Sequence, residues 1–546
     1  MSDRAAPTPL GIDYVSPLPP VRSGISDYSV DLLPHLARLA DVRVLRLPDQ
    51  PVSEEVEERW RPLPAEAALA EGARRLPLYQ MGNNRYHEEV GRLARLFPGV
   101  LTLHDLVLHH LLSEKTLGRG VFEPYRQRLA EDHGRLGELI AVPRRWGGYS
   151  DASLFSLPAH RGLLFSQRGV LVHSRWAAGV LEEASPELAV RVVPMGVPLP
   201  AEVDAAAGAA FRRRFGVPEG APVLGSFGFQ TPIKRTHRVV ETLARPGLEG
   251  VHLLVVGQVS EHSDLEGTAR RAGVADRIHV TGFVSFEDFE AAIAATDLCL
   301  NLRYPTAGET SASLLRVLAV GRPAVVSDHA QFAELPDEVA LKVPLGEEEV
   351  DVLAARLRDL LAAPRALAEM GRRARQYVAR EHAPERAAEA IVSACRELAE
   401  RDPMPAPSVR EAAPSSISWS RFDGELTVHG AELPWQVGER RQLTLELTNR
   451  GPCRWLAARR GPGGVAVEAQ LWVQREGRPT NLLAGEPWIP LPRDLGEGES
   501  CTLRTRVRRP PAPARLRFEP HVVGGAGFEG QGGPCWQRQL AEGEEE

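Results

Sequence analysis

The sequence predicts two α/β domains built on mostly parallel sheets, followed by a smaller all-β domain. Three observations support this prediction. From Leu10 to Pro344, short apolar segments alternate with amphipathic ones, which is typical of successive βα units. Residues 401–416 are rich in Pro, Ala and Ser, as linkers are. Six of the nine tryptophans follow Ile417, where apolar and polar residues alternate with a period of two.

Each α/β domain has its own series of expected strands. In the first domain, residues 1–205, apolar runs occupy residues 11–15, 42–47, 76–80, 100–103, 169–174 and 191–196. In the second domain, residues 206–379, they occupy residues 222–228, 252–257, 277–282, 298–302, 324–327 and 340–344. Fully apolar runs separated by helical stretches favour parallel sheets covered on both faces, so we expect two Rossmann-like domains in succession.

The rest of the chain divides at prolines and at the linker. Residues 351–400 have the spacing of amphipathic helices, and Pro364 and Pro384 separate one helix from the next. Short strands between Gly and Pro turns then predict a β-sandwich, and the acidic end is expected to be disordered. The expected linker, sandwich and tail are residues 401–416, 417–541 and 542–546.

Composition restricts the function. The 546 residues carry a net charge of −7, which argues against nucleic acid as a partner because no basic tract offsets it. The first residues lack a signal-peptide pattern, and no apolar run approaches the roughly 20 residues that span a bilayer, so we expect a soluble cytoplasmic protein. Five cysteines without a CxxC pair indicate neither disulfides nor a zinc site.

The chemistry is expected at the turn within residues 297–328, DLCLNLRYPTAGETSASLLRVLAVGRPAVVSD. A strand ends there, Ser311 can cap the following helix, and Gly321 terminates that helix. The amide dipoles of the helix N-terminus would favour an anion such as a phosphate. Arg303, Glu309 and Thr310 surround the junction. A capping box would place Glu at the third helical position, where the chain has Leu314 instead, which favours a functional role.

Three further groups follow expected strands. Ser23 and Gly24 form a turn into a helix and can place backbone amides beside a ligand. His104 lies at the carboxyl end of strand 100–103, with Asp105 beside it to fix the histidine tautomer. The third group comprises Lys234 and Arg235, which lie near the first helix of the second domain and can join its dipole against a diphosphate.

Other polar residues are better explained by structure than by chemistry. His109 and His110 lie in an apolar helical stretch, where packing is expected. Arg144, Arg145 and Trp146 could touch a membrane surface or an anionic acceptor, but a solvated basic loop is the better interpretation.

Residues 10–400 resemble the retaining nucleotide-sugar glycosyltransferases of family 4, which have the GT-B fold. The resemblance rests on ordered segments: SPLPPVRSGISDYS, YQMGNNRYH, FPGVLTLHDLVLHHLL, HSRWAAGVL, VVPMGVP, GSFGFQTPIK and GETSASLLRVLAVGRPAVVSD. It implies two domains facing a cleft, with helices of about residues 380–400 crossing back to the first domain. It also implies a nucleotide-diphosphate sugar donor, a hydroxyl acceptor on a glycan, lipid or protein, retention of configuration, and neither metal nor cofactor.

The resemblance also assigns roles to individual residues. Lys234 would hold the diphosphate, His104 would contact the transferred sugar, and Gly24 would lie on the acceptor side with Ser23. His104, Glu309 and Lys234 are the expected catalytic residues. The expected donor-binding set is Gly228, Lys234, Arg235, Arg303, Gly308, Glu309, Thr310, Ser311 and Arg316.

The chain departs from the family pattern in two places. Many members have Arg after the glycine equivalent to Gly228, where this chain has Phe229. Many also carry two glutamates eight positions apart. When the family pattern is aligned on Gly321, the second glutamate corresponds to Arg316. The first corresponds to Gly308 or, if the alignment is shifted by one residue, to Glu309. The usual ribose acceptor is therefore missing, and Arg303 with Arg316 could supply the cations that Phe229 does not.

The region after the linker looks like the tryptophan-rich immunoglobulin-like modules found beside bacterial glycosyltransferases. Its tryptophans could stack on sugar rings, although core packing is the more frequent role.

Three alternatives to a transferase remain. A nucleotide-sugar epimerase or a phosphorylase would use the same fold. A noncatalytic nucleotide-sugar or glycan-binding protein would explain Phe229, Arg316 and the appended domain together.

Overall fold

The computed structural model describes residues 9–71, 75–145, 151–200, 204–404, 416, 422–457, 464–475, 477–523, 527–531 and 533–541. Most of the expected linker, the acidic tail 542–546 and Trp146 lie outside the described residues. The chain forms two compact units: residues 1–106 with 163–406, and residues 107–162 with 407–546. The first unit contains both α/β domains.

The sheet of the first α/β domain is parallel, with the order β3-β2-β1-β4-β5-β6-β7. Its strands are β1 (Gly11–Val15), β2 (Asp41–Arg46), β3 (Leu63–Pro64), β4 (Leu76–Met81), β5 (Val100–Leu103), β6 (Gly169–Val172) and β7 (Val190–Val192). Its helices include α1 (Gly24–Leu36), α2 (Glu54–Trp60), α3 (Ala65–Ala70), the 3₁₀ turn η1 (Arg85–His87), α4 (Glu88–Leu96), α8 (Arg161–Phe165) and α9 (Arg175–Ala184). The all-parallel pairing confirms the expected Rossmann-like arrangement.

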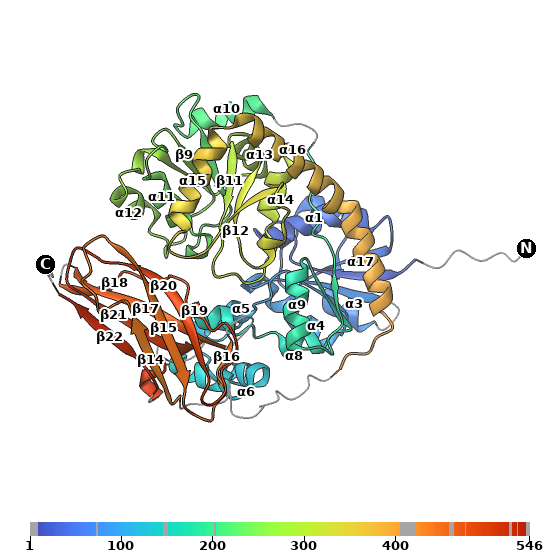
Figure 1. Cartoon of the computed structure of the whole chain (residues 1–546). Helices are drawn as coiled ribbons and strands as arrows, with labels where there is room; N and C mark the ends of the chain where they lie inside the picture. Colours follow the sequence, from blue (N-terminus) through green and yellow to red (C-terminus); the bar gives the residue numbers. More distant parts are fainter. Residues whose placement is uncertain are drawn as a thin grey trace, which may run out of the picture. The chain divides into compact units, whose positions relative to one another are not determined.

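The second sheet is also parallel, with the order β10-β9-β8-β11-β12-β13. Its strands are β8 (Val223–Phe227), β9 (His252–Val256), β10 (Ile278–Gly282), β11 (Leu298–Asn301), β12 (Ala324–Ser327) and β13 (Ala340–Val343). Helices cover it on both sides (Figure 1): α10 (Ala205–Arg214), α11 (Thr236–Leu243), α12 (Leu265–Arg271), α13 (Phe286–Ala294), α14 (Ala312–Ala319), α15 (Glu349–Leu361) and α16 (Pro364–Glu381). Short 3₁₀ turns are η3 (Pro232–Lys234), η4 (Ala275–Arg277) and η5 (Ala330–Glu334).

The last helix of this unit, α17 (Pro384–Leu398), begins at the second proline that the sequence analysis singled out. It packs against α1 and β6 of the first domain (Figure 1). Arg191 of β7 forms an ion pair with Glu397 at the end of α17. The chain therefore returns from the second domain to the first, and one hydrophobic core includes residues of both.

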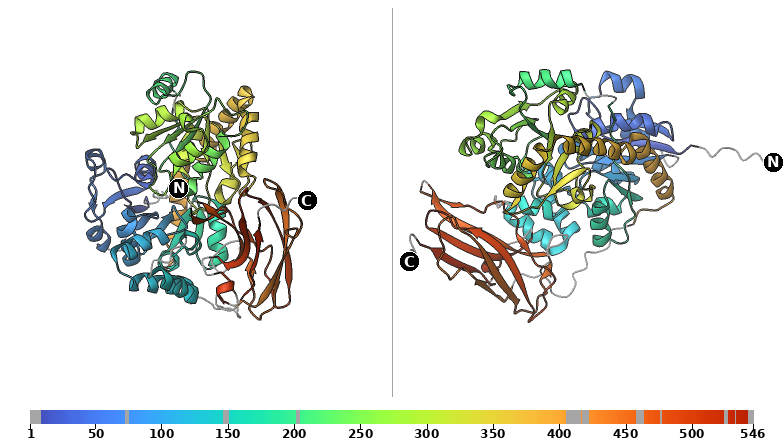
Figure 2. Two further views of the ribbon diagram at one scale, coloured as in Figure 1. Left: turned by 90° about the vertical axis from the view of Figure 1, so that its left-hand side faces the viewer. Right: turned by 45° about the horizontal axis from the view of Figure 1, so that its top comes forward.

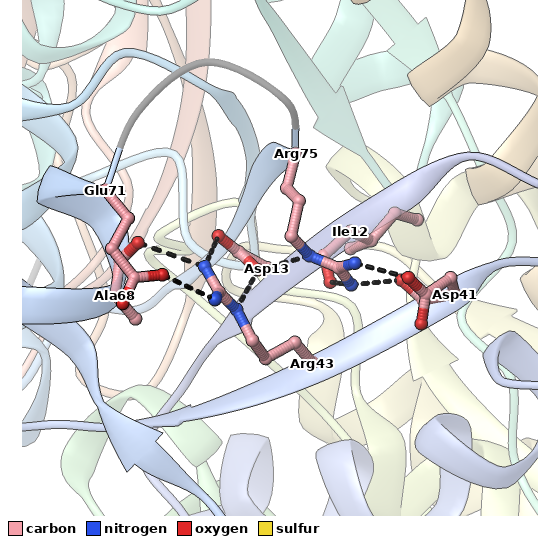
Figure 3. A network of polar contacts seen from close by, with 7 residues as sticks. All are labelled: Ile12, Asp13, Asp41, Arg43, Ala68, Glu71 and Arg75. Carbon is pink, nitrogen blue, oxygen red and sulfur yellow. Dashed lines mark hydrogen bonds and ion pairs between the residues drawn. The ribbon is translucent and has the colours of Figure 1, made fainter.

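A polar network braces the amino-terminal edge of the first sheet (Figure 3). The Asp13 carboxylate is 3% exposed and accepts hydrogen bonds from Arg43 Nε at 2.8 Å and Arg75 Nε at 2.9 Å. Arg75 also pairs with Asp41, and Arg43 with Glu71. Because these groups come from β1, β2 and the segments entering β2 and β4, the network fixes the relative positions of three neighbouring strands.

The second unit contains a helical segment that belongs to residues 1–205, the range expected for the first α/β domain. Its elements are α5 (His109–Lys115), η2 (Leu117–Arg119), α6 (Glu123–Arg145) and α7 (Asp151–Ser156), and α6 is broken at Gly134. His109 is buried and contacts the Tyr125 hydroxyl at 2.7 Å, as expected of a packing residue. Arg144 and Arg145 lie over aromatic rings of the same segment.

The β part of the second unit is a two-layered arrangement of mostly antiparallel strands (Figure 2). One layer has the order β14-β15-β20: β14 (Gly424–His429), β15 (Arg440–Asn449) and β20 (Ser500–Arg508). The other layer contains β16 (Leu456–Ala457), β17 (Gly464–Arg475), β18 (Arg478–Asn481), β19 (Ile489–Pro490), β21 (Ala514–Val522) and β22 (Trp536–Leu540), with η6 (Glu529–Gln531) between the last two. Trp435 and Trp455 are buried in the shared core, as expected of structural tryptophans.

None of the helices in the described residues combines the length and the apolar character that crossing a membrane requires. All five cysteines are free, and four of them are buried.

Candidate functional site

The candidate site lies at the carboxyl ends of β8 and β11, which are neighbours in the second sheet. The loops that follow these strands, residues 228–235 and 302–311, meet there, and the Tyr304 amide donates to the Ile233 carbonyl at 2.9 Å. Open α/β sheets bind ligands at this edge because loops and helix N-termini converge outside the strand ends. These two loops carry most of the residues expected to bind a donor.

The N-terminus of α14 is capped as the sequence predicts. Ser311 Oγ accepts a hydrogen bond from the Leu314 amide at 3.3 Å and donates one to Asn301 Oδ1 at 3.1 Å. Thr310 precedes this cap and is partly buried. The remaining amides of a first helical turn have no partner within the helix, so this end of α14 is suited to an anion.

Lys234 ends the turn η3 and is held beneath the loop after β8. Its Nζ donates to the Phe227 carbonyl, and a Cβ on Gly228 would lie 2.8 Å from that nitrogen. Gly228 also has a φ of +86°, so glycine is required there on two grounds. Burial, reinforced by the charge of Arg303, holds the pKa of Lys234 well below its ordinary value. A nearby anion would raise this pKa and favour the charged ammonium.

Arg303 and Glu309 form an ion pair at 2.9 Å across the loop that precedes α14. Their side chains are 11% and 18% exposed. The other Glu309 oxygen accepts from the Thr306 hydroxyl at 3.1 Å and the Ala307 amide at 3.0 Å. Glu309 therefore organises the loop through contacts within the protein. Arg303 Nε is buried without a hydrogen-bond partner among the described residues, which leaves a donor for a ligand.

The end of β5 in the first domain reaches the same loop. The Leu106 amide donates to the Ala307 carbonyl at 2.7 Å, and a Cβ on Gly308 would lie 2.6 Å from the Leu106 side chain. Gly308 has a φ of +80°, so both space and backbone conformation require glycine. This contact brings the first domain to the strand-end site.

His104 belongs to a buried cluster. Its Nε2 lies 2.9 Å from Gln80 Oε1, its Nδ1 lies 3.3 Å from His173 Nε2, and the Tyr28 ring packs edge-on against the imidazole. Burial holds the pKa of His104 well below its ordinary value, with His173 adding to the effect. The imidazole is therefore neutral at physiological pH, and its 5% exposure leaves a small surface for ligand contact.

Asp105 was expected to hydrogen-bond to His104 and fix its tautomer, but the structure does not show this bond. Its Oδ2 accepts from the Asn83 amide at 2.9 Å instead. Burial, followed by the charge of Glu309, raises the pKa of Asp105 to about 7. This carboxyl therefore titrates near neutrality next to the candidate site, a property typical of functional groups.

Helix α1 links the loop that contains Ser23 to α14. Ser23 caps α1, its Oγ accepting from the Ile25 amide at 3.4 Å, and Gly24 is exposed at the helix start. Two turns along, Asp31 pairs with Arg316 of α14. Arg316, one of the residues expected to bind the donor, is thus engaged with the first domain and also lies over the Phe286 ring.

Two residues of the loop after β8, Arg235 and Phe229, are not part of the cluster formed by Lys234, Arg303 and Glu309. Arg235 is 2% exposed, and its Nε donates to Glu349 Oε1 at 2.9 Å, so its guanidinium stabilises the start of α15. Phe229 instead projects outward and is 55% exposed.

A cavity of about 450 Å³ is lined by part of this loop and by residues of α11 and α12. Its lining includes Gln230, His237, His262, Asp264 and Arg271. The lining of this cavity includes neither Lys234 nor any residue of the loop before α14.

The site loops follow from local sequence patterns, whereas several of the residues that contact them do not. Asp31, Gln80 and His173 touch expected site residues, yet they lie 285, 24 and 69 positions away from them in the chain. The strand-end position of His173, directly after β6, was the available signal.

The fold is GT-B. Sucrose-phosphate synthase from Thermosynechococcus elongatus superposes over 71% of this chain and 99% of its own, with a TM-score of 0.51 and 18% identity. HepE from Anabaena, in complex with UDP and glucose, superposes over 71% and 100%, with a TM-score of 0.50 and 16% identity. At these identities the likeness establishes the arrangement of two Rossmann-like domains.

Sequence similarity is concentrated in the second domain. Residues 221–363 match the family described as glycosyl transferases group 1, and this segment contains both site loops. The 2-deoxystreptamine glucosyltransferase of Streptomyces kanamyceticus is 27% identical over 186 residues, or 33% of this chain. The chain spans 46% of the length of that relative.

Proposed function

We propose that the chain is a glycosyltransferase that moves a sugar from a nucleoside-diphosphate donor to a hydroxyl acceptor. One observation carries the proposal. The segment that matches the group 1 family, residues 221–363, supplies a partly buried lysine, an arginine whose Nε has no partner among the described residues, and a capped helix N-terminus at one sheet edge. These are the groups that neutralise a diphosphate leaving group.

In the proposed reaction, the donor diphosphate lies against Lys234, Arg303 and the N-terminus of α14. Its negative charge raises the pKa of Lys234 and so favours the ammonium cation beside the leaving group when the glycosidic bond breaks. The acceptor hydroxyl attacks the anomeric carbon on the same face and gives its proton to the departing phosphate, with retention of configuration. His104 contacts the sugar as a neutral imidazole.

Charge neutralisation by these groups requires neither a metal ion nor a cofactor, and we include metal independence in the proposal. The free thiols agree with a reducing compartment, so we place the protein in the cytoplasm.

Nucleotide release tests this proposal. The pure protein is incubated with UDP-, GDP- and ADP-sugars, with and without EDTA, in the presence of a cell extract as the acceptor source. UDP-glucose heads the panel because HepE was crystallised with UDP and glucose, and the Streptomyces relative is a glucosyltransferase. We expect release from one donor class and a product that keeps the anomeric configuration of the donor.

Lys234→Ala should lower this turnover by about 100-fold, because a preorganised charge at the leaving group is lost. Lys342→Ala is the matched control, since Lys342 lies on β13 and pairs with Asp337. Equal turnover in wild type and Lys234→Ala would contradict the assignment.

A noncatalytic nucleotide-sugar-binding protein is the second candidate. The exposed Phe229 and the engagement of Arg316 by Asp31 favour it, because both remove groups that family members direct at the donor. Binding of a nucleotide sugar without release in any extract would select this alternative. Interconversion of the donor sugar without an acceptor would select an epimerase.

A further inference from the structure

The outer face of the sheet β14-β15-β20 carries a row of arginines. Arg504, Arg506 and Arg508 alternate along β20, and all three are exposed, whereas Leu503 and Val507, on the other face of the strand, are buried in the core. Successive arginines are therefore about 7 Å apart on one face. Arg440 of β15 lies directly opposite Arg508 and is also exposed. We refer to these four residues as the arginine face.

The arginine face concentrates positive charge on a chain whose net charge is −7. Like charges directly opposite each other on neighbouring strands repel one another, as Arg440 and Arg508 do here. Glu446 lies on the same face but opposite Thr502, toward the other end of the strands, where it contacts His429 at 3.4 Å. A partner with dense negative charge would offset the repulsion.

The arginine face ends at a loop with an apolar tip. In loop 430–439, which joins β14 to β15, Leu433 and Val437 are each 59% exposed. Gly438 of this loop accepts a hydrogen bond from Arg508 Nε at 3.1 Å, so the loop directly adjoins the arginine face. The loop also contains Glu432 and Glu439, of which Glu439 pairs with Arg441, so the four arginines still leave the combined surface positive.

The exposure of these two aliphatic side chains is imposed by the structure of the loop. Trp435, between them in sequence, is buried, and its Nε1 donates to the Glu439 carbonyl at 3.2 Å. Arg441 donates to the Leu433 carbonyl at 2.9 Å and to the Gly430 carbonyl at 3.3 Å. The loop is therefore braced at several points and holds Leu433 and Val437 outward.

We propose that this surface docks the protein onto an anionic lipid bilayer. The arginine face lies over the headgroups, and Leu433 and Val437 enter the boundary between headgroups and acyl chains. Basic residues near an anionic membrane each strengthen binding, and aliphatic side chains gain from leaving water. A nucleic acid or another soluble polyanion would interact with the arginines but would give no gain for the aliphatic tip, which is why we assign a membrane. This inference does not depend on the proposed activity.

Vesicle co-sedimentation tests the proposal with the full chain. The vesicles contain either phosphatidylcholine alone or an equimolar mixture with phosphatidylglycerol. We expect sedimentation with the anionic vesicles only, and release at high salt. The variant R504E/R506E/R508E should bind at least about tenfold more weakly, because each basic side chain contributes a factor of about five near such a surface. L433S/V437S should also weaken binding while keeping the salt dependence.

The matched control is R365E/R372E/R373E, which changes the net charge equally on exposed positions of α16. It should bind as the wild type does. Absence of wild-type binding to anionic vesicles would overturn the proposal, as would an equal loss in the control. Binding to heparin with no binding to vesicles would assign the face to a soluble polyanion and overturn the membrane assignment. Unchanged circular dichroism confirms that each variant is folded.

Discussion

At the scale of single residues, the candidate site depends on charges held in place by short contacts. Lys234 is fixed by the Phe227 carbonyl below Gly228, and Arg303 is fixed by Glu309. The structure thus separates two roles that sequence reasoning assigned together: Glu309 positions the loop and the arginine, whereas Arg303 retains a donor for a ligand. Arg303 is therefore the more informative residue to change.

Arg303→Ala should weaken binding of the nucleoside diphosphate by about 2–3 kcal/mol, since one partner of a buried charge pair is removed along with a phosphate donor. Isothermal titration calorimetry with UDP, GDP and ADP measures this loss. Glu309→Gln, which keeps the loop hydrogen bonds in part, should have a smaller effect. An unchanged donor affinity in Arg303→Ala would show that Arg303 does not contact the ligand.

At the scale of elements, charged networks position strands far from the site. The clearest is the network around Asp13, where one buried carboxylate neutralises Arg43 and Arg75 together (Figure 3). The network lies toward the amino ends of strands in the first sheet, whereas the candidate site lies at the carboxyl ends of β8 and β11 in the second sheet. Changes here should therefore affect stability and leave the site chemistry intact.

Asp13→Asn should lower the free energy of unfolding by about 3–5 kcal/mol, because two guanidinium groups lose a shared buried counter-ion. Asp41→Asn is the control. Its side chain is 62% exposed, so the expected loss is below about 1 kcal/mol. Urea denaturation followed by circular dichroism compares the two, and a similar loss in both variants would contradict the assigned role of Asp13.

In the β part, His521 forms a comparable cluster, 3.0 Å from Glu468 and 3.6 Å from Glu519. Burial alone would lower the pKa of His521, but hydrogen bonds and charges from the two glutamates outweigh it and raise the pKa to about 8. A raised pKa stabilises the fold below the ordinary value of 6.5, and this contribution is lost as pH rises through 8.

We therefore expect wild-type stability to fall by up to about 2 kcal/mol between pH 6 and 9 relative to His521→Gln. Unfolding followed by tryptophan fluorescence reports on this region, which holds most tryptophans. His429→Gln, at a residue with a 51% exposed side chain, should keep the wild-type dependence. If His521→Gln has the same pH profile as the wild type, the cluster does not titrate as described.

The elements themselves followed closely from the sequence. Apolar runs and caps such as Ser311 and Ser23 located the parallel strands and the helix starts because these features act locally. The ion-pair partner of Arg235 could not be predicted from the sequence. Its neighbour Lys234 faces the site, yet Arg235 turns to Glu349, more than a hundred residues later, because its backbone adopts a φ of +53°. Long-range pairs of this kind leave no local pattern.

At the scale of the molecule, the unit that contains both α/β domains is joined around the candidate site. The Leu106 amide bonds to the Ala307 carbonyl, Asp31 pairs with Arg316, and α17 returns to pack on α1. Both halves therefore contribute to the surroundings of the loop before α14. Such an arrangement suits a reaction between two substrates, with the donor on one domain and the acceptor approaching from the other.

A crystal structure of the protein with bound nucleoside diphosphate tests the central claim most directly. The account predicts that the phosphates lie within hydrogen-bonding distance of Lys234, Arg303 and the first-turn amides of α14. It also predicts that the cavity between α11 and α12 stays free of nucleotide. Phosphates bound in that cavity, or anywhere remote from Lys234, would contradict the assignment of the site.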